Sequence, residues 1–172
     1  MSSPLLHAGP AVGFDTPFEM LDACHERVRR TLDLLQRLQA HVARHGADEQ
    51  ARSAAGDVLR YFDIAAPLHH QDEELHVLPR LRAQGLGELA DQLQADHDAL
   101  RQRWQVLREP LRALQDGQQP GGLAGADCEG LAQHYARHMV LEDGTAFAAA
   151  RQGLDSPALA AMGAEMAARR RG

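Results

Sequence analysis

Apolar residues recur along this chain at alternating steps of three and four positions, and this pattern constrains the fold more than any other feature. Such spacing gathers side chains on one face of an α-helix, which has about 3.6 residues per turn. One stripe runs from Phe18 to Val42, and the clearest stripe comprises Leu86, Leu89, Leu93, Leu100, Trp104, Leu107, Leu111 and Leu114. The pattern predicts long amphipathic helices.

Start and stop signals give the approximate helix boundaries. The run Thr16-Pro17-Phe18-Glu19 predicts a capping box at the start of the first helix. Pro67 lies inside the second helix and is predicted to kink it. The predicted long helices cover about residues 17–44, 48–85, 86–115 and 127–152. A short tail helix, capped by Ser156-Pro157, covers about 156–170.

Composition and length support one helical domain. Only 4% of the 172 residues are aromatic, and helix-favouring residues such as Ala, Leu, Gln, Arg and Glu dominate. A chain of this length can bury a core without disulfides. We predict a single all-α domain over residues 1–172. Its core would be an up-down-up-down four-helix bundle over about 17–151, flanked by an N-terminal arm of residues 1–15 and the tail helix.

The charge balance excludes some classes of partner. The chain has 24 acidic and 18 basic residues and a formal net charge of -6. This balance argues against nucleic acid, whose phosphates require a basic surface. No apolar run approaches the roughly 18 residues of a membrane span, and no signal-type leader is visible. We therefore expect a cytoplasmic protein with no nucleic-acid or membrane partner. The run Arg169-Arg170-Arg171 is interpreted as a solvated helix end that complements the helix dipole.

Histidine and glutamate pairs carry the chemistry. The run His69-His70-Gln71-Asp72-Glu73-Glu74 pairs His69 with Glu73, and His70 with Glu74, at a spacing of four. Residues four apart share a helix face, so each pair can direct two ligands at one point. His138 and Glu142 repeat this arrangement on the last long helix.

Two more histidines fall on the apolar faces of the remaining helices. His25 continues the first stripe, and His97 fills the gap between Leu93 and Leu100 in the clearest one. Two divalent ions a few Å apart repel each other, bridging carboxylates offset that repulsion, and neutral imidazoles complete each shell. The predicted ligand set is His25, His69, Glu73, His97, His138 and Glu142, with two iron ions favoured over manganese or zinc.

Some ligand assignments stay open. His69 continues the face of Val58, Phe62 and Ala65, so His69 and Glu73 are preferred as the ligands of this helix. His70 and Glu74 are the alternative pair of ligands. His70, Glu74 and Asp143 are then expected to be solvated or to orient ligands. His134 lies one turn before His138, so it is an alternative ligand.

These stretches resemble the hemerythrin and HHE-type cation-binding domains. The resemblance rests on Cys24-His25-Glu26-Arg27, on His69 through Pro79, on Asp96-His97-Asp98 and on His138 through Asp143. It covers roughly residues 18–151 and implies that the six predicted residues are ligands, with Glu73 and Glu142 as bridges. Oxygen-carrying members have a further histidine one turn before the third-helix histidine, where this chain has Leu93. That difference argues against pure reversible oxygen carriage.

The leading functional hypothesis is a non-haem di-iron protein that binds or senses oxygen, nitric oxide or iron, rather than an enzyme. One alternative is an oxidase or peroxidase-like activity at the same centre. Another is an interaction module that the metal only stabilises.

Overall fold

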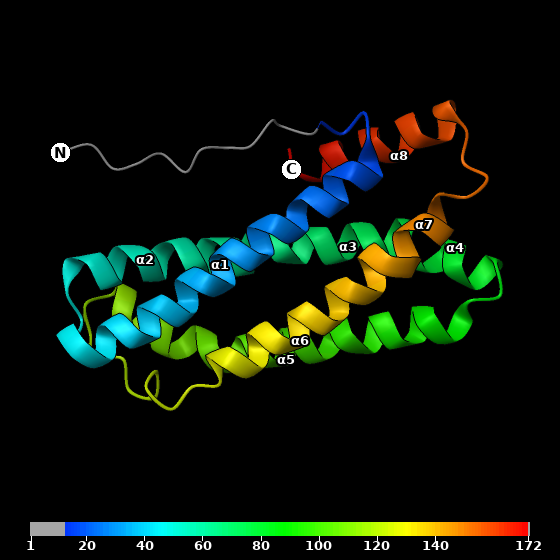
Figure 1. Ribbon diagram of the computed structural model, residues 1–172. Coiled ribbons are helices and arrows are strands. Elements are labelled where there is room, and N and C mark those ends of the chain that lie inside the picture. The colour runs from blue at the N-terminus through cyan, green and yellow to red at the C-terminus, as the bar shows by residue number, and fades with distance from the viewer. Residues whose placement is uncertain (1–12, 172) are drawn as a thin grey trace.

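The computed structural model describes residues 13–171, and within them every regular element is helical (Figure 1). The all-α prediction is therefore confirmed for this part of the chain. Most of the predicted N-terminal arm lies outside the described residues. The elements are α1 (Pro17–His45), α2 (Glu49–Arg60), η1 (Tyr61–Ala65), α3 (Ala66–His76), α4 (Leu78–Ala83), α5 (Gly87–Gln115), α6 (Cys128–Leu141), η2 (Glu142–Ala146), α7 (Phe147–Arg151) and α8 (Ser156–Arg169).

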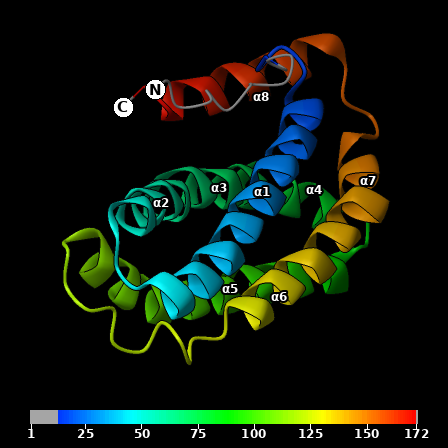
Figure 2. The same cartoon turned by 60° about the vertical axis from the view of Figure 1, so that its left-hand side comes forward.

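The long helical segments lie side by side as a bundle. The α1 helix packs on α2 and α6, and α5 packs on α2, α4 and α6. The α8 helix lies outside these segments and contacts α1 and α3 (Figures 1 and 2). A helical bundle is thus present, whereas the predicted up-down-up-down order of four helices stays a prediction.

Two apolar clusters fill the interior, and a polar layer separates them. One cluster includes Leu35, Leu100 and Leu111, and the other includes Leu21 and Leu93. Along α1, α3 and α5, the buried polar residues follow one cluster and precede the other. The buried polar residues are His25, His69, His70, Asp72, Glu73, His97, His138 and Glu142.

The predicted second helix is interrupted just before Pro67. The segment η1 is a π-helix, in which the N–H of Ala66 donates to the carbonyl of Tyr61, five residues earlier. Proline has no N–H, and its ring clashes with the carbonyl four residues before it, so a wider turn relieves both problems. The predicted disturbance at Pro67 therefore takes the form of a π-turn. A second π-helix, η2, begins at Glu142.

Two predicted helix caps are wrong. The Thr16 side chain makes no capping bond and instead donates to the carbonyl of Gly13 at 3.4 Å. Its backbone φ of -125° and ψ of 77° hold it outside the geometry that a capping box needs. The tail helix is capped by Asp155, which accepts from the N–H of Ala158 at 2.9 Å, rather than by Ser156.

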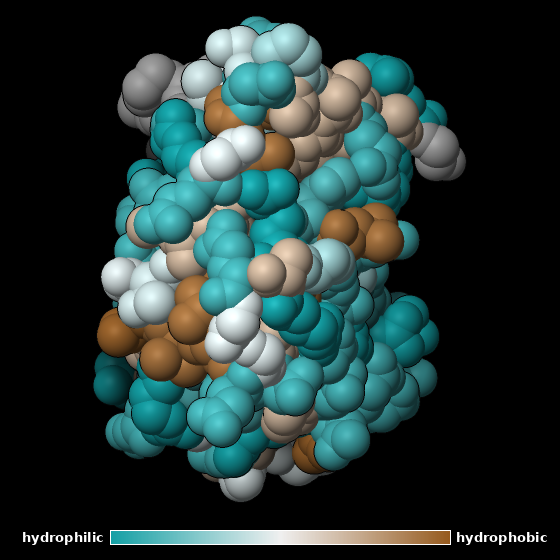
Figure 3. Space-filling model, turned by 90° about the vertical axis from the view of Figure 1, so that its right-hand side faces the viewer, coloured by the Kyte–Doolittle hydropathy of each residue, from teal (hydrophilic) through white to brown (hydrophobic). Residues whose placement is uncertain are grey.

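The surface shows no large apolar face from the side of α4 and α7. In that view hydrophilic side chains predominate, and hydrophobic ones form separate small patches (Figure 3). Among residues 13–171, no helix combines the length and apolarity that a membrane span needs.

The sequence suggested that the arginines at the end of α8 are solvated, but two of them pair with a buried carboxylate. Asp72 is fully buried on α3, and its Oδ1 accepts from Arg169 Nε and Nη2 at 3.0 and 2.8 Å. Its Oδ2 accepts from Arg170 Nη2 at 2.7 Å. Because a buried carboxylate needs a countercharge, these two arginines dock α8 onto the bundle.

Replacing both Arg169 and Arg170 by Ala is expected to lower the free energy of unfolding by about 3 kcal/mol, because Asp72 would keep a buried, unpaired charge. Urea unfolding monitored by circular dichroism measures the loss. Adding Asp72→Asn should restore much of the stability. Arg171→Ala, at an exposed position, is the matched control. A double variant as stable as this control would contradict the proposed docking.

Candidate metal centre

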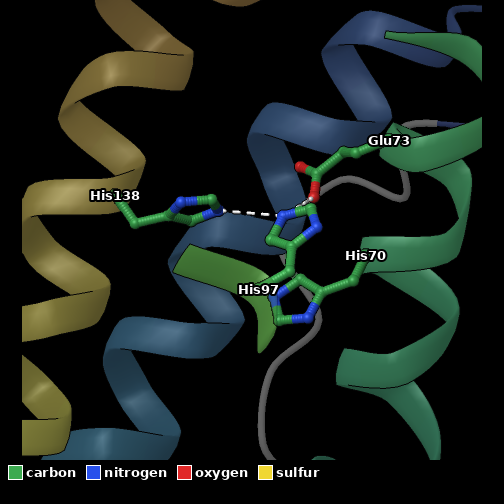
Figure 4. A group of neighbouring side chains, drawn as sticks. All are labelled: His70, Glu73, His97 and His138. Carbon is green, nitrogen blue, oxygen red and sulfur yellow. Dashed lines mark hydrogen bonds and ion pairs between the residues drawn. The ribbon is translucent and has the colours of Figure 1, made fainter. Parts of the chain in front are cut away.

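The buried polar layer gathers imidazoles and carboxylates from every long segment of the bundle. Two groups of four residues share Glu73, and within each group the candidate ligand atoms lie within 4.8 Å of one another. Figure 4 shows one group, with His97 of α5 between His138 of α6 and Glu73 of α3. The groups are His70, Glu73, His97 and His138, and His25, His69, Glu73 and Glu142.

Glu73 divides its two oxygens between the groups. Its Oε1 lies 2.9 Å from His69 Nε2 and 3.9 Å from His25 Nε2. Its Oε2 lies 3.2 Å from His97 Nε2. One carboxylate therefore faces imidazoles on both sides, as a bridge between two metal ions would.

Glu142 divides its oxygens in the same way. Its Oε2 lies 3.0 Å from His25 Nε2, and its Oε1 lies 3.0 Å from His138 Nε2 and 3.8 Å from His97 Nε2. Both carboxylates thus lie between the same two sets of imidazoles. This symmetry is what a doubly carboxylate-bridged pair of cations requires.

The carboxylate oxygens at the centre lack hydrogen-bond partners. Among residues 13–171, all four carboxylate oxygens of Glu73 and Glu142 and the Nε2 of His25 are buried without a hydrogen bond. Their short contacts therefore lack hydrogen-bond geometry. Unsatisfied buried polar atoms are costly, and a cation held among them would satisfy them together. The residues present fit a metal pair.

Outer carboxylates orient the imidazoles. His25 Nδ1 lies 2.7 Å from Asp143 Oδ1, and His97 Nδ1 lies 2.9 Å from Glu74 Oε1. His138 Nδ1 lies 3.4 Å from Asp96 Oδ2. A proton on each Nδ1 leaves the Nε2 lone pair directed at the centre, which is how metal-binding histidines are commonly fixed.

Burial and the neighbouring charges shift the pKa values of the imidazoles. Burial lowers the pKa of His25, but the adjacent carboxylates of Glu142 and Glu73 outweigh it and raise that pKa to about 9. The pKa of His97 rises to about 11, since Glu142, Glu73 and Glu74 outweigh its burial. In contrast, burial and the charge of His97 hold the pKa of His70 well below its usual value. His70 is therefore a neutral imidazole with an available lone pair.

The carboxylates stay ionised in spite of their burial. Burial and the charge of Glu73 raise the pKa of Glu142, but His138, His25 and His97 outweigh them and lower it to about 2. The pKa of Glu73 is likewise held well below its usual value, because the nearby imidazoles, His69 foremost, outweigh its burial. Two ionised carboxylates side by side in a core attract cations strongly.

His70 is buried in the core rather than solvated. Its side chain is 3% exposed and stacks on His97, with ring centroids 4.1 Å apart and an interplanar angle of 11°. The π-turn η1 inserts an extra residue per turn before α3. A continuous α-helix extrapolated from Val58 and Phe62 therefore predicts the wrong inward face for α3. Both His69 and His70 point inward.

The remaining candidates lie farther from the centre. Glu74 bonds to His97 and Arg101, and Asp143 bonds to His25 and Arg29, so both orient the cluster from outside. His134 is partly exposed and lies 3.2 Å from Asp96 Oδ1. Leu93 is fully buried in an apolar cluster.

The roles of Asp96 and Asp72 could not be predicted from the sequence. Asp96 precedes His97 and is one helical position away from the inward face, so only the three-dimensional packing of α5 on α6 brings it to His138. Asp72 lies between predicted ligands, and its partners are 97 and 98 residues away in the chain. The one available signal for Asp96 was its place beside an inward histidine.

The fold and this cluster together define a helical protein with a buried histidine and carboxylate centre suited to metal cations. Residues 16–150 match the model of the hemerythrin HHE cation binding domain, and the chain belongs to this family. It is also 35% identical over 159 residues to an uncharacterized protein of Haemophilus influenzae, and the match covers 91% of each chain.

Stability of the metal-free protein is expected to fall as the pH rises from about 6.5 through 9. The pKa of His25 is about 9, above its ordinary value of 6.5, so its protonated form stabilises the fold fully below pH 6.5 and progressively less above it. His25 alone should account for about 3 kcal/mol of this loss, and the raised pKa of His97 adds to it. Urea unfolding of chelator-treated protein measures the total. A flat or rising profile over this range would contradict the arrangement of charges described above.

Proposed function

We propose that this protein is a non-haem di-iron protein that binds or senses a small ligand. Glu73 and Glu142 would bridge two iron ions, with His25 and His69 on one side and His97 and His138 on the other. The supporting observation is that each carboxylate divides its oxygens between the two sets of imidazoles. An up-down-up-down four-helix bundle over the single domain would hold these ligands rigidly.

The donor set favours iron. Nitrogen and carboxylate oxygen donors suit iron or manganese, and zinc less specifically, whereas a thiolate site or an all-oxygen cage would indicate other ions. Cys24 and Cys128 are buried but belong to neither group of candidate ligands. Manganese and zinc are therefore second choices.

His70 supplies the third imidazole on the side of His97 and His138. We infer that it takes the place of the imidazole that Leu93 does not provide. The side of His25 and His69 then has one imidazole fewer and is the place for an exchangeable ligand. Bound iron would supply the redox-active position for oxygen or nitric oxide.

The surroundings of His25 suit a small apolar ligand. Phe147 stacks on His25 with ring centroids 5.4 Å apart, and Phe18 packs edge-on against Phe147. This aromatic wall excludes water, and Asp143 holds the His25 proton at Nδ1. A cytoplasmic location and the absence of a nucleic-acid partner stay predictions.

Peroxidase-like chemistry is the second candidate. The observation that favours it is a cavity lined by His70, which would place a reducing substrate beside one of the candidate ligands. Turnover of peroxide with a reducing substrate would distinguish this function from binding alone.

Elemental analysis of protein purified anaerobically is expected to find about two irons per chain, as the paired-ligand arrangement implies. Glu73→Ala should reduce the iron content at least about tenfold, because both ions lose a shared ligand. The control Glu26→Ala changes an exposed glutamate on α1 and should retain the metal. Full iron content in Glu73→Ala would contradict the bridging role.

A matched pair of variants tests whether His70 is a metal ligand. His70→Leu is expected to lower the iron affinity by about tenfold or more, measured by competition with a chelator. His134→Leu should leave the affinity unchanged, because His134 lies outside both ligand groups. Equal effects of the two substitutions would argue against ligation by His70.

A further inference from the structure

A cavity of about 290 Å³ lies beside the metal centre, between η1, α3, α5 and α6. Its walls combine apolar side chains with a rim of polar ones. The lining residues include Phe62, Asp63, His70, Trp104, Arg108 and Tyr135. The volume is close to the lower end of small-molecule sites, which begin at about 300 Å³.

Aromatic rings make the inner walls. Phe62 lies between Trp104 and Tyr135, with ring centroids 4.9 and 5.7 Å away. Tyr135 stacks on His70 at 6.0 Å with an interplanar angle of 26°. All three aromatic residues are at most 5% exposed, so their positions are fixed by packing. A planar ring inserted here would meet aromatic faces, which favour stacked or edge-on contacts.

The rim has a surplus of positive charge near Asp63. This carboxylate accepts from Trp104 Nε1 at 2.9 Å and from Arg108 Nε at 2.8 and 3.1 Å. Arg112 lies 3.7 Å from the same carboxylate, so two guanidinium groups share one negative charge. Within residues 13–171 the terminal nitrogens of Arg108 make no hydrogen bond, and its side chain is 25% exposed. A guanidinium with free donors suits a carboxylate.

We propose that this cavity binds a small aromatic carboxylate, with the ring among Phe62, Trp104 and Tyr135 and the carboxylate on Arg108. The rings provide the apolar contact area, and Arg108 provides the charge-assisted hydrogen bonds. Because His70 forms the inner wall, the ligand would lie against the metal centre.

This inference goes beyond the proposed metal function, since the binding contacts come from residues outside the predicted bridges. Binding can therefore be tested in metal-free protein, separately from the iron content. Loss of iron binding would contradict the proposed function alone, and loss of carboxylate binding would contradict this inference alone.

The single tryptophan of the chain is a built-in reporter, because Trp104 lines the cavity. Benzoate titrated into the metal-free full-length protein is expected to change the Trp104 emission saturably. Benzamide, which keeps the ring without the charge, and acetate, which keeps the charge without the ring, should each bind about tenfold more weakly. An unsaturable response to benzoate, or equal affinity for the three probes, would overturn the proposal.

Arg108→Gln should raise the dissociation constant for benzoate by about tenfold or more, since it removes the charge-assisted bonds. Arg103→Gln is the matched control, because Arg103 lies on the same helix but pairs with Asp127 instead of lining the cavity. Unchanged affinity in Arg108→Gln would overturn the assignment of the carboxylate to this residue. If circular dichroism shows that Arg108→Gln does not fold, the three probes in the unaltered protein decide the question.

Discussion

Two ionised carboxylates in the middle of a helical bundle are the constraint on which the rest of the structure depends. Glu73 and Glu142 are at most 1% exposed, and leaving either unpaired at that depth would cost several kcal/mol. Imidazoles from α1, α3, α5 and α6 surround both carboxylates and pair with them. Apolar clusters above and below keep water out of this layer and hold the ligands in place.

A second layer of charges compensates the first. Asp143, Glu74 and Asp96 bond to the outer nitrogens of His25, His97 and His138, and Arg29 and Arg101 then bond to Asp143 and Glu74. From the buried carboxylates outward to solvent, acidic groups thus alternate with imidazoles and arginines. The same principle docks α8, where Arg169 and Arg170 neutralise the buried Asp72.

Much of this arrangement could be predicted from periodicity. The regular apolar stripe of α5 predicted both this helix and the inward position of His97. The histidine and glutamate pairs at a spacing of four predicted that Glu73 and Glu142 face the core together with two histidines. The burial of His70 could not be predicted in this way, because η1 changes the helical phase before α3. The partners of Asp72 and Asp96 depend on packing between helices distant in the chain. The cavity, likewise, is formed only when η1, α3, α5 and α6 meet.

The measurement that tests the central claim most directly is anomalous X-ray diffraction at the iron edge from crystals of the iron-loaded protein. We expect two iron peaks, with Glu73 and Glu142 each bound to both ions through separate oxygens. His25 and His69 should lie at one peak, and His70, His97 and His138 at the other. A single peak, or iron outside this buried layer, would contradict a carboxylate-bridged di-iron centre.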